Sequence, residues 1–134
     1  MGDMREPSLD EDGWRLLNAE ERQQTYPGSF ELPDLRIRNA LTIGDYAKLL
    51  FEIGVSGDET DEDVVERMWV IVRETLDGRY IGVLDNKPDS IAENDRLWLG
   101  VEVPFGPEHV IDAQIGDVES AILAAKEPLR RWSR

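Results

Sequence analysis

The sequence predicts an α+β domain in which four or five antiparallel strands form a meander, closed as a strongly bent sheet or partial barrel. Short helices are expected before this sheet and one helix after it. Two observations carry the prediction. Several short runs alternate apolar with polar residues, as half-buried strands do, and an Asp-Gly pair joins two of the apolar runs. The length of 134 residues and the 40% share of hydrophobic residues suit one domain with a buried core.

The N-terminal residues 1–13 are acidic and contain few apolar anchors. Burial cannot offset the entropy that such a segment loses on ordering, so we expect a flexible acidic arm ahead of a single domain at 14–134. Trp14 and Trp132 stand at the two ends of that domain, where we expect them to pin its termini.

Two short helices are expected at the start of the domain. Asn18 and Glu21 occupy the positions of a reciprocal capping box, which predicts a helix that stops before Pro27. Pro33 suits the first turn of a second short helix that reaches Arg38.

The central residues predict strands joined by short turns. Apolar and polar residues alternate over 46–53, which indicates a half-buried strand. Residues 68–72 are apolar on both faces, which favours a central strand with Trp69 in the core. Asp77-Gly78 then predicts a tight hairpin into a strand at 79–84.

The later residues predict two more strands and a helix. Alternation over 97–103 indicates a fourth strand that Pro104 ends, and residues 109–112 suit a short closing strand. Glycines inside the predicted strands mark bulges or sharp bends, at Gly82 and Gly100. Asp117 caps the final helix, which Pro128 ends or kinks. Its apolar face, the face that normally turns toward a core, consists of Val118, Ala121, Ile122 and Ala125.

Charge excludes several classes of partner. The chain has 29 acidic and 15 basic side chains, a net charge of −14, and residues 45–112 carry −11 of it. Such a charge repels nucleic-acid phosphate and anionic lipid, so we expect binding to neither nucleic acid nor membranes. The start of the chain does not resemble a secretory signal, and no apolar run approaches the roughly 20 residues that span a bilayer. These observations predict a cytoplasmic protein.

Cofactor and metal motifs are absent from the sequence. Without cysteine, the chain has no disulfide, no thiolate zinc site, no iron–sulfur cluster and no cysteine nucleophile. Phosphate-binding glycine loops and the serine-hydrolase elbow are also missing. We therefore predict no cofactor and no metal, and the oligomeric state stays open.

An ordered series of segments resembles a known family. Its most specific part is the strand Met68-Trp69-Val70 followed by the turn from Gly82 through Asn86 to Pro88. It resembles a family of small bacterial proteins known as domain of unknown function 2314, with immunity-protein-like relatives. The similar block covers about residues 30–112. The resemblance implies a compact α+β or mainly-β domain with a protein-binding role, and it implies no catalytic residues.

Three groups of side chains are candidates for a site. The first is the acidic loop, which could be a solvated surface, a contact for a basic partner or a weak cation site, although its spacing does not fit a calcium loop. It contains Asp58, Glu59, Asp61, Glu62 and Asp63. The second is the strand end Asp85-Asn86, which forms a turn and offers polar side chains. The third is the lone His109, either a general base or a structural residue.

Trp98 is the last candidate, because it lies out of phase with its apolar neighbours and could cover the sheet or anchor a partner. The sequence thus favours a non-enzymatic protein-binding module with an acidic surface that recognises a basic protein, with an immunity-like role as one version. One alternative is a small-ligand binder or enzyme that uses Asp85, Asn86 and His109. The other alternative is a structural accessory domain.

Overall fold

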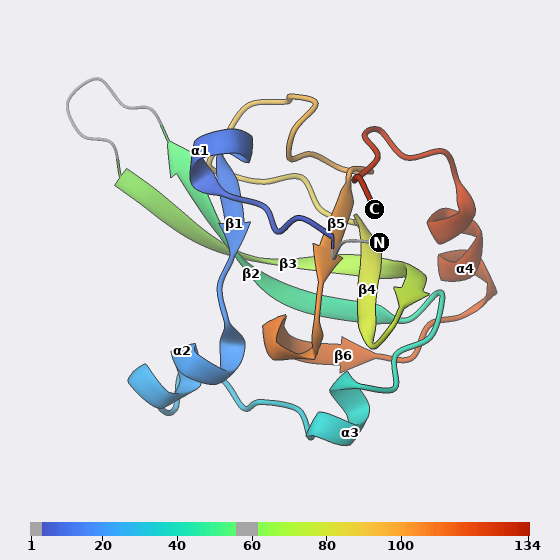
Figure 1. Cartoon of the computed structure of the whole chain (residues 1–134), viewed down its shortest axis with the longest axis horizontal. Coiled ribbons are helices and arrows are strands. Elements are labelled where there is room, and N and C mark those ends of the chain that lie inside the picture. Colours follow the sequence, from blue (N-terminus) through green and yellow to red (C-terminus); the bar gives the residue numbers. More distant parts are fainter. Residues whose placement is uncertain (1–3, 56–61) are drawn as a thin grey trace.

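The computed structural model describes residues 4–55 and 62–134 and shows an α+β domain built on one strongly curled antiparallel sheet, a half-barrel (Figure 1). The sheet has the strand order β1-β2-β3-β4-β5, and β6 also pairs with β2. The strands are β1 (Trp14–Leu16), β2 (Tyr46–Val55), β3 (Glu62–Leu76), β4 (Arg79–Leu84), β5 (Glu102–Phe105) and β6 (Val110–Gln114). This confirms the predicted fold class.

The predicted hairpin and one predicted bend are confirmed. β3 turns into β4 through Asp77 and Gly78, whose φ angles of 47° and 80° are the positive pair that a type I′ turn requires. A bulge in β3 begins after Val72, which pairs with Gly82 of β4. A Cβ atom on Gly82 would lie 2.9 Å from the Val70 side chain, so the close approach of the two strands requires glycine here.

The fourth predicted strand is shorter than its alternating pattern suggests. Residues 97–100 form turns, Gly100 has a φ of 96°, and β5 begins only at Glu102. The strand then continues through Pro104, which we expected to end it. Proline is tolerated in an outer strand, where its missing N–H leaves no ladder partner unsatisfied.

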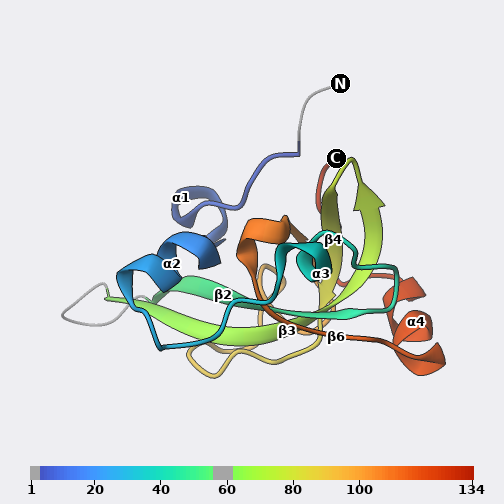
Figure 2. The same ribbon diagram turned by 90° about the horizontal axis from the view of Figure 1, so that it is seen from below.

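The last strand departs from a simple meander. β6 pairs with residues 46–49 of β2, and β1 pairs with residues 51–53 on the same edge of β2. Between β5 and β6, the short 3₁₀ helix Pro107–His109 carries the chain from the outer strand β5 to β2, on the other side of β3 and β4. Figure 2 shows β6 running beside β2.

Residues 4–13, expected as part of a flexible arm, contain helix α1 (Leu9–Asp12) and contact the domain. Met4 packs against the core, and the other contacts of the segment are polar, so a search for apolar residues misses them. The Asp12 carboxylate is buried and accepts hydrogen bonds at 2.7 and 3.0 Å from Arg5. The indole N–H of Trp132 donates to the Arg5 carbonyl at 2.8 Å.

The two terminal tryptophans pin the termini, as predicted. Trp14 and Trp132 are both buried, and their rings meet edge to face at 5.9 Å. The N- and C-terminal segments therefore lie side by side, as Figure 1 shows.

The two short helices that were predicted before the sheet form where the capping residues predict them. Helix α2 (Ala19–Thr25) begins after Asn18, whose side chain accepts a hydrogen bond from the Glu21 N–H. Helix α3 (Leu35–Arg38) is capped by Asp34, one residue beyond the expected Pro33.

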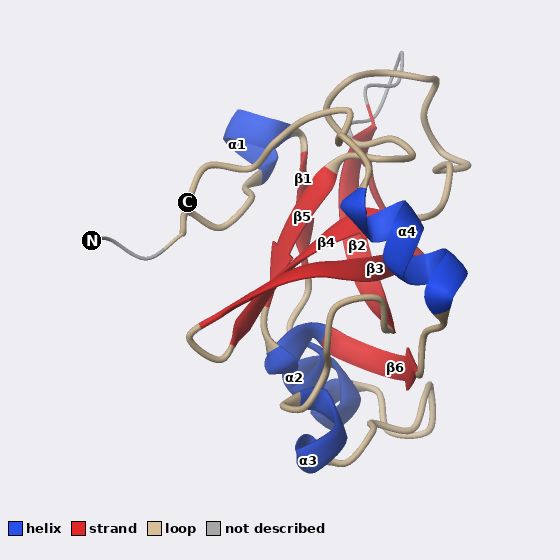
Figure 3. Ribbon diagram, turned by 90° about the vertical axis from the view of Figure 1, so that its right-hand side faces the viewer, coloured by secondary structure: helices blue, strands red, loops and turns tan. Residues whose placement is uncertain are grey.

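Helix α4 (Val118–Ala125) is capped by Asp117 as predicted, but its buried face is not the predicted one. Ser120 and Ala124 are buried, whereas 76% of Val118 and 57% of Ile122 are exposed. Small side chains let the helix approach closely: a Cβ atom on Gly44 would lie 3.2 Å from that of Ala121. The larger apolar side chains consequently face outward. Figure 3 shows α4 packed beside the sheet, at the end opposite α2 and α3.

The core lies mainly inside the half-barrel and has two smaller extensions on the outer face of the sheet. The extensions join the sheet to the N-terminal helices through Leu50 and to α4 through Ile71. Trp69, expected in the core, is half-buried on the outer face, where Lys48 Nζ lies 5.1 Å from its ring. No helix in the described part of the chain is both long and apolar enough to cross a membrane.

A buried carboxylate, Glu102 of β5, holds the C-terminal residues against the sheet. Its side chain is fully buried and accepts two hydrogen bonds from the Arg134 guanidinium, at 2.9 and 3.0 Å, and one from the Trp132 N–H at 2.7 Å. Arg73 Nε of β3 lies 3.0 Å from the same carboxylate. Arg73 also donates to the carbonyls of Ala124 and Lys126, so it caps the C-terminus of α4.

We expect Glu102→Gln to lower the free energy of unfolding by about 3 kcal/mol, because it removes the charge that two guanidiniums face in a buried site. Urea unfolding followed by tryptophan fluorescence measures the change. The matched control is Glu74→Gln, which removes only a surface partner of Arg134 and should cost less than about 1 kcal/mol. Equal losses in the two variants would contradict a central role for Glu102.

The hydrogen-bonded carboxylates also predict how stability depends on pH. Burial alone would raise the pKa values of Asp12, Asp45, Glu66 and Glu102, but hydrogen bonds outweigh burial and lower all four. Their stabilisation is therefore complete above the ordinary carboxyl pKa values of 3.8 and 4.5. It should be lost as pH falls through the lower values of the folded state. Urea midpoints measured between pH 7 and pH 2.5 should fall steeply below about pH 4, and a flat profile there would contradict this account.

Candidate functional site

The strand-end residues that the sequence proposed as one constellation do not meet. Asp85 follows the last residue of β4, whereas His109 lies beside Arg79 at the first residue of that strand. Six residue steps of extended chain separate the two ends, about 20 Å at 3.3 Å per residue. A site that uses both Asp85 and His109 is therefore excluded by this geometry.

An apolar pocket of about 280 Å³ lies at the Asp85 end of β4. Its floor is formed by Ile71 of β3 and by Val83 and Leu84 of β4. The turn before β5 and the last part of α4 form the walls, with Leu99 and Leu123. Three residues that follow α4, Lys126, Glu127 and Pro128, complete the rim.

The backbone around the pocket is well fixed by hydrogen bonds. The Asp85 N–H donates to the Trp69 carbonyl at 2.9 Å, and the Gly100 N–H donates to the Leu84 carbonyl at 2.8 Å. The Asn86 side chain accepts a hydrogen bond from the Trp69 N–H at 2.5 Å, which ties the end of β4 to β3. Asn86 therefore has a structural role, and it positions the residue before it.

The Asp85 carboxylate itself accepts no hydrogen bond and forms no ion pair with any residue in 4–55 or 62–134. Burial raises the pKa of this carboxyl group, and nothing in its surroundings opposes the shift. Glu66 shows the contrast, because its carboxylate accepts hydrogen bonds from the backbone N–H groups of Asp89 and Ser90, at 2.9 and 3.0 Å, and from the Ser90 hydroxyl. Within the part of the chain that the structure describes, Asp85 is thus a partly buried charge without a partner.

His109 is a structural residue. It is buried, and its Nδ1 accepts a hydrogen bond from the Gly106 N–H at 3.0 Å, which stabilises the turn after β5. Desolvation lowers its pKa, so the imidazole is neutral near pH 7 and carries its proton on Nε2.

His109 also belongs to a cluster with Glu6 and Glu108 whose ligand atoms lie within 4.8 Å of one another. Two observations argue against a metal there. A neutral imidazole with Nδ1 as acceptor has no free electron pair on Nε2. Arg79 already supplies the cation, with its guanidinium 3.0 Å from Glu108 and 3.5 Å from Glu6.

Trp98 is half-buried and lies in the turn before β5, so the alternation argument that placed it on the outer face of a strand does not apply. Its carbonyl accepts a hydrogen bond from the Val101 N–H at 3.1 Å.

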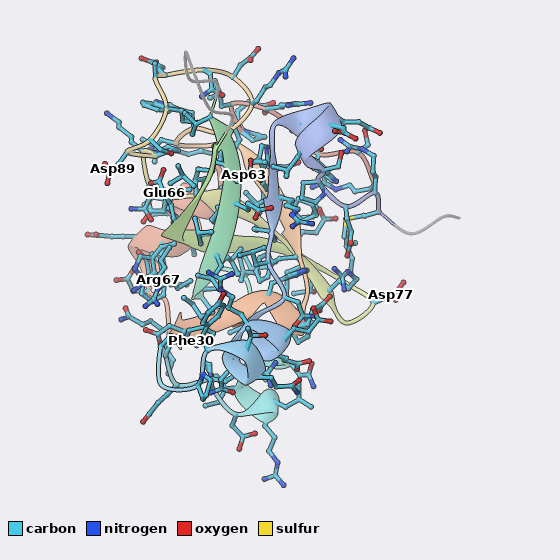
Figure 4. The ribbon with its side chains drawn as sticks, turned by 90° about the vertical axis from the view of Figure 1, so that its left-hand side faces the viewer. Phe30, Asp63, Glu66, Arg67, Asp77 and Asp89 are labelled. Atoms are coloured by element: carbon cyan, nitrogen blue, oxygen red, sulfur yellow. The ribbon has the colours of Figure 1, made fainter. Side chains whose placement is uncertain are left out.

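The acidic loop gives no complete site. Asp58, Glu59 and Asp61 lie outside the described residues, and Glu62 is described only as the first residue of β3. Asp63 is exposed. In Figure 4, Glu66 lies next to Asp89 on the same side of the molecule, and Arg67 lies next to Phe30.

An exposed apolar surface, which was not predicted from the sequence, lies next to the pocket. Leu99 and Leu123 line the pocket and are 43% and 40% exposed. Exposed apolar side chains continue along and around α4, and we call the set the α4 apolar face: Ile115, Val118, Ile122, Leu123 and Leu129. The spacing of Ser120 and Ala124 is the signal that could have found it, because two small residues four positions apart mark the side of the helix that packs closely.

Comparisons with known proteins return no match: no family model, no curated protein and no solved structure is similar to the chain.

We expect Asp85→Asn to raise the free energy of unfolding at pH 7 by about 0.5–1 kcal/mol, because it removes an unpaired charge, and partial exposure keeps the gain small. The raised pKa gives the sign: stability is highest below the ordinary pKa of 3.8 and falls as pH rises through the folded value. The gain should vanish at pH 3, where both variants are neutral at this position. Urea unfolding at the two pH values tests this, and a loss of stability at pH 7 would overturn the description of Asp85 as unpaired.

Proposed function

We propose that the protein is a non-enzymatic binding module that recognises a basic protein partner. One observation carries the proposal: Asp85 lines an apolar pocket beside exposed apolar side chains, and its carboxylate has no partner among residues 4–55 and 62–134. A folded protein retains an uncompensated charge at a cost in stability, and such residues are common where the charge serves binding.

The overall charge supports the same proposal. The net charge of −14 attracts a basic protein at long range and speeds the encounter between the two. Short-range affinity requires apolar contact as well, and the α4 apolar face supplies it. A charged surface without apolar residues would favour only weak, transient binding. This protein has both a large negative charge and an exposed apolar surface.

An immunity-like role is one version of the proposal. An acidic protein can block a basic, nucleic-acid-acting toxin by covering its positive surface. The resemblance of residues 30–112 to immunity-protein-like domains suggests this version, and the charge of the strand-rich middle of the chain agrees with it.

A small-ligand binder is the alternative that one observation favours, namely the apolar pocket at Asp85. Its volume of about 280 Å³ is just below the roughly 300–1,000 Å³ of typical ligand sites. A catalytic role would require a second group, such as a nucleophile or a general base, within hydrogen-bond reach of the reacting atoms. The sequence-predicted candidate for that group, His109, lies at the far end of β4.

The full-length chain, immobilised and exposed to an extract of the cells that produce it, should retain a basic protein. Since long-range attraction is screened by salt, retention should fall steeply between about 0.05 and 0.5 M NaCl. The purified partner should then bind with an association rate that drops at least tenfold over the same range. Enrichment of no basic protein, or binding that salt does not affect, would contradict the proposal.

A further inference from the structure

The pocket at Asp85 combines two properties that few single ligand groups satisfy together. Its floor and walls are apolar, from Ile71, Val83, Leu84, Leu99 and Leu123, and Asp85 also lines it, with a carboxylate that has no partner among the described residues. The main-chain hydrogen bonds of Asp85 and Gly100 fix the floor before any ligand arrives. A ligand therefore meets a prepared cavity and does not have to order it.

Only a cation on an apolar stem suits both properties. An uncharged apolar side chain would bury the carboxylate further and leave it unpaired, which is costly. An acidic side chain would be repelled. Lysine and arginine place a methylene stem along apolar surface and present a charged head, so their shape and charge match the pocket.

Resting on the proposed function, we infer that the Asp85 pocket receives one lysine or arginine side chain of the basic partner. The volume of about 280 Å³ suits a single long side chain better than a larger ligand. The α4 apolar face then contacts apolar residues that flank the inserted side chain. Contacts of this kind exclude water from around the ion pair, as the ring of weaker contacts does around a hot spot.

The other charged groups at the rim set the strength of this site. Glu127 adds a second carboxylate, although it also faces Arg131 at 3.3 Å on the surface. Lys126 lines the rim and has no carboxylate within 4.0 Å among the residues that the structure describes. Its ammonium group competes with an incoming cation, so Lys126→Gln should tighten binding two- to fivefold.

The inference can be tested without the partner, by NMR titration of the full-length protein with the peptide acetyl-Leu-Lys-Leu-amide. Backbone amide signals of Asp85, Leu99, Gly100 and Leu123 should shift. The matched peptide with norleucine in place of lysine keeps the stem and lacks the charge, and it should bind at least tenfold more weakly. Equal binding of the two peptides, or shifts that map elsewhere, would overturn the inference.

Two variants complete the experiment. Asp85→Asn should lose at least tenfold in affinity for the lysine peptide while staying folded. Asp89→Asn alters an exposed carboxylate in the same loop and should keep the affinity within twofold. An unchanged affinity in Asp85→Asn would overturn the inference.

The same variants separate the inference from the proposed function. A captured basic partner that binds Asp85→Asn as tightly as the unaltered chain would refute the pocket as the anchor and leave the binding role intact. Absence of any basic partner would refute the binding role, and the peptide titration would still decide whether the pocket selects a cation.

Discussion

The buried Glu102 carboxylate is the interaction on which the closure of the fold depends. A half-barrel has two outer strands, here β1 and β5, that share no ladder in the described part of the chain. The gap between them is filled by chain ends, with Trp14 against Trp132. Glu102 holds those ends in place through Arg134 and the Trp132 N–H, and through Arg73 it connects them to α4. One carboxylate thus links β3, β5 and the C-terminal segment.

Burying a carboxylate is costly unless hydrogen bonds offset its loss of hydration, and several acidic residues of this protein are satisfied in this way. Glu102, Asp12 and Glu66 each accept several hydrogen bonds, which offset the loss of hydration. Asp85 has an equally fixed backbone, but none of the described residues donates a hydrogen bond to its side chain. The same chain therefore uses carboxylates in two ways, as internal ties and as an uncompensated group at the surface. The second use is the reason that we locate a binding site at Asp85.

Local sequence signals predicted those parts of the fold that local physics determines. The capping residues Asn18 and Asp117 and the Asp77-Gly78 turn act within a few residues, and all three were confirmed. The return of β6 to β2 depends on contacts across the whole sheet, and no local pattern encodes that pairing. The hydrogen bonds of Asp12 and Glu102 were also not predicted, because no sequence pattern identifies the partners of these two carboxylates.

The candidate site was predictable in part. The sequence singled out Asp85 as a polar residue at a strand end, but it grouped Asp85 with His109, which β4 keeps far away. The exposure of the α4 apolar face was not predicted, because helical periodicity defines an apolar face without showing whether it points to the core or to solvent. Here, small residues on the other side, Ser120 and Ala124, decide the orientation. Helix periodicity alone therefore cannot distinguish a core surface from a docking surface in a helix this short.

The contact between Arg5 and Trp132 joins positions 127 residues apart and has a consequence for biosynthesis. A nascent chain cannot seal its sheet while the C-terminal segment is still inside the ribosome, because that segment supplies Trp132 and the arginine that neutralises Glu102. Until then, apolar residues such as Trp14 and Phe51 stay accessible. Because long-range strand pairing is also slow, the sheet closes late in folding. Before the sheet closes, exposed apolar side chains favour association between copies, and the net charge of −14 opposes it by repulsion.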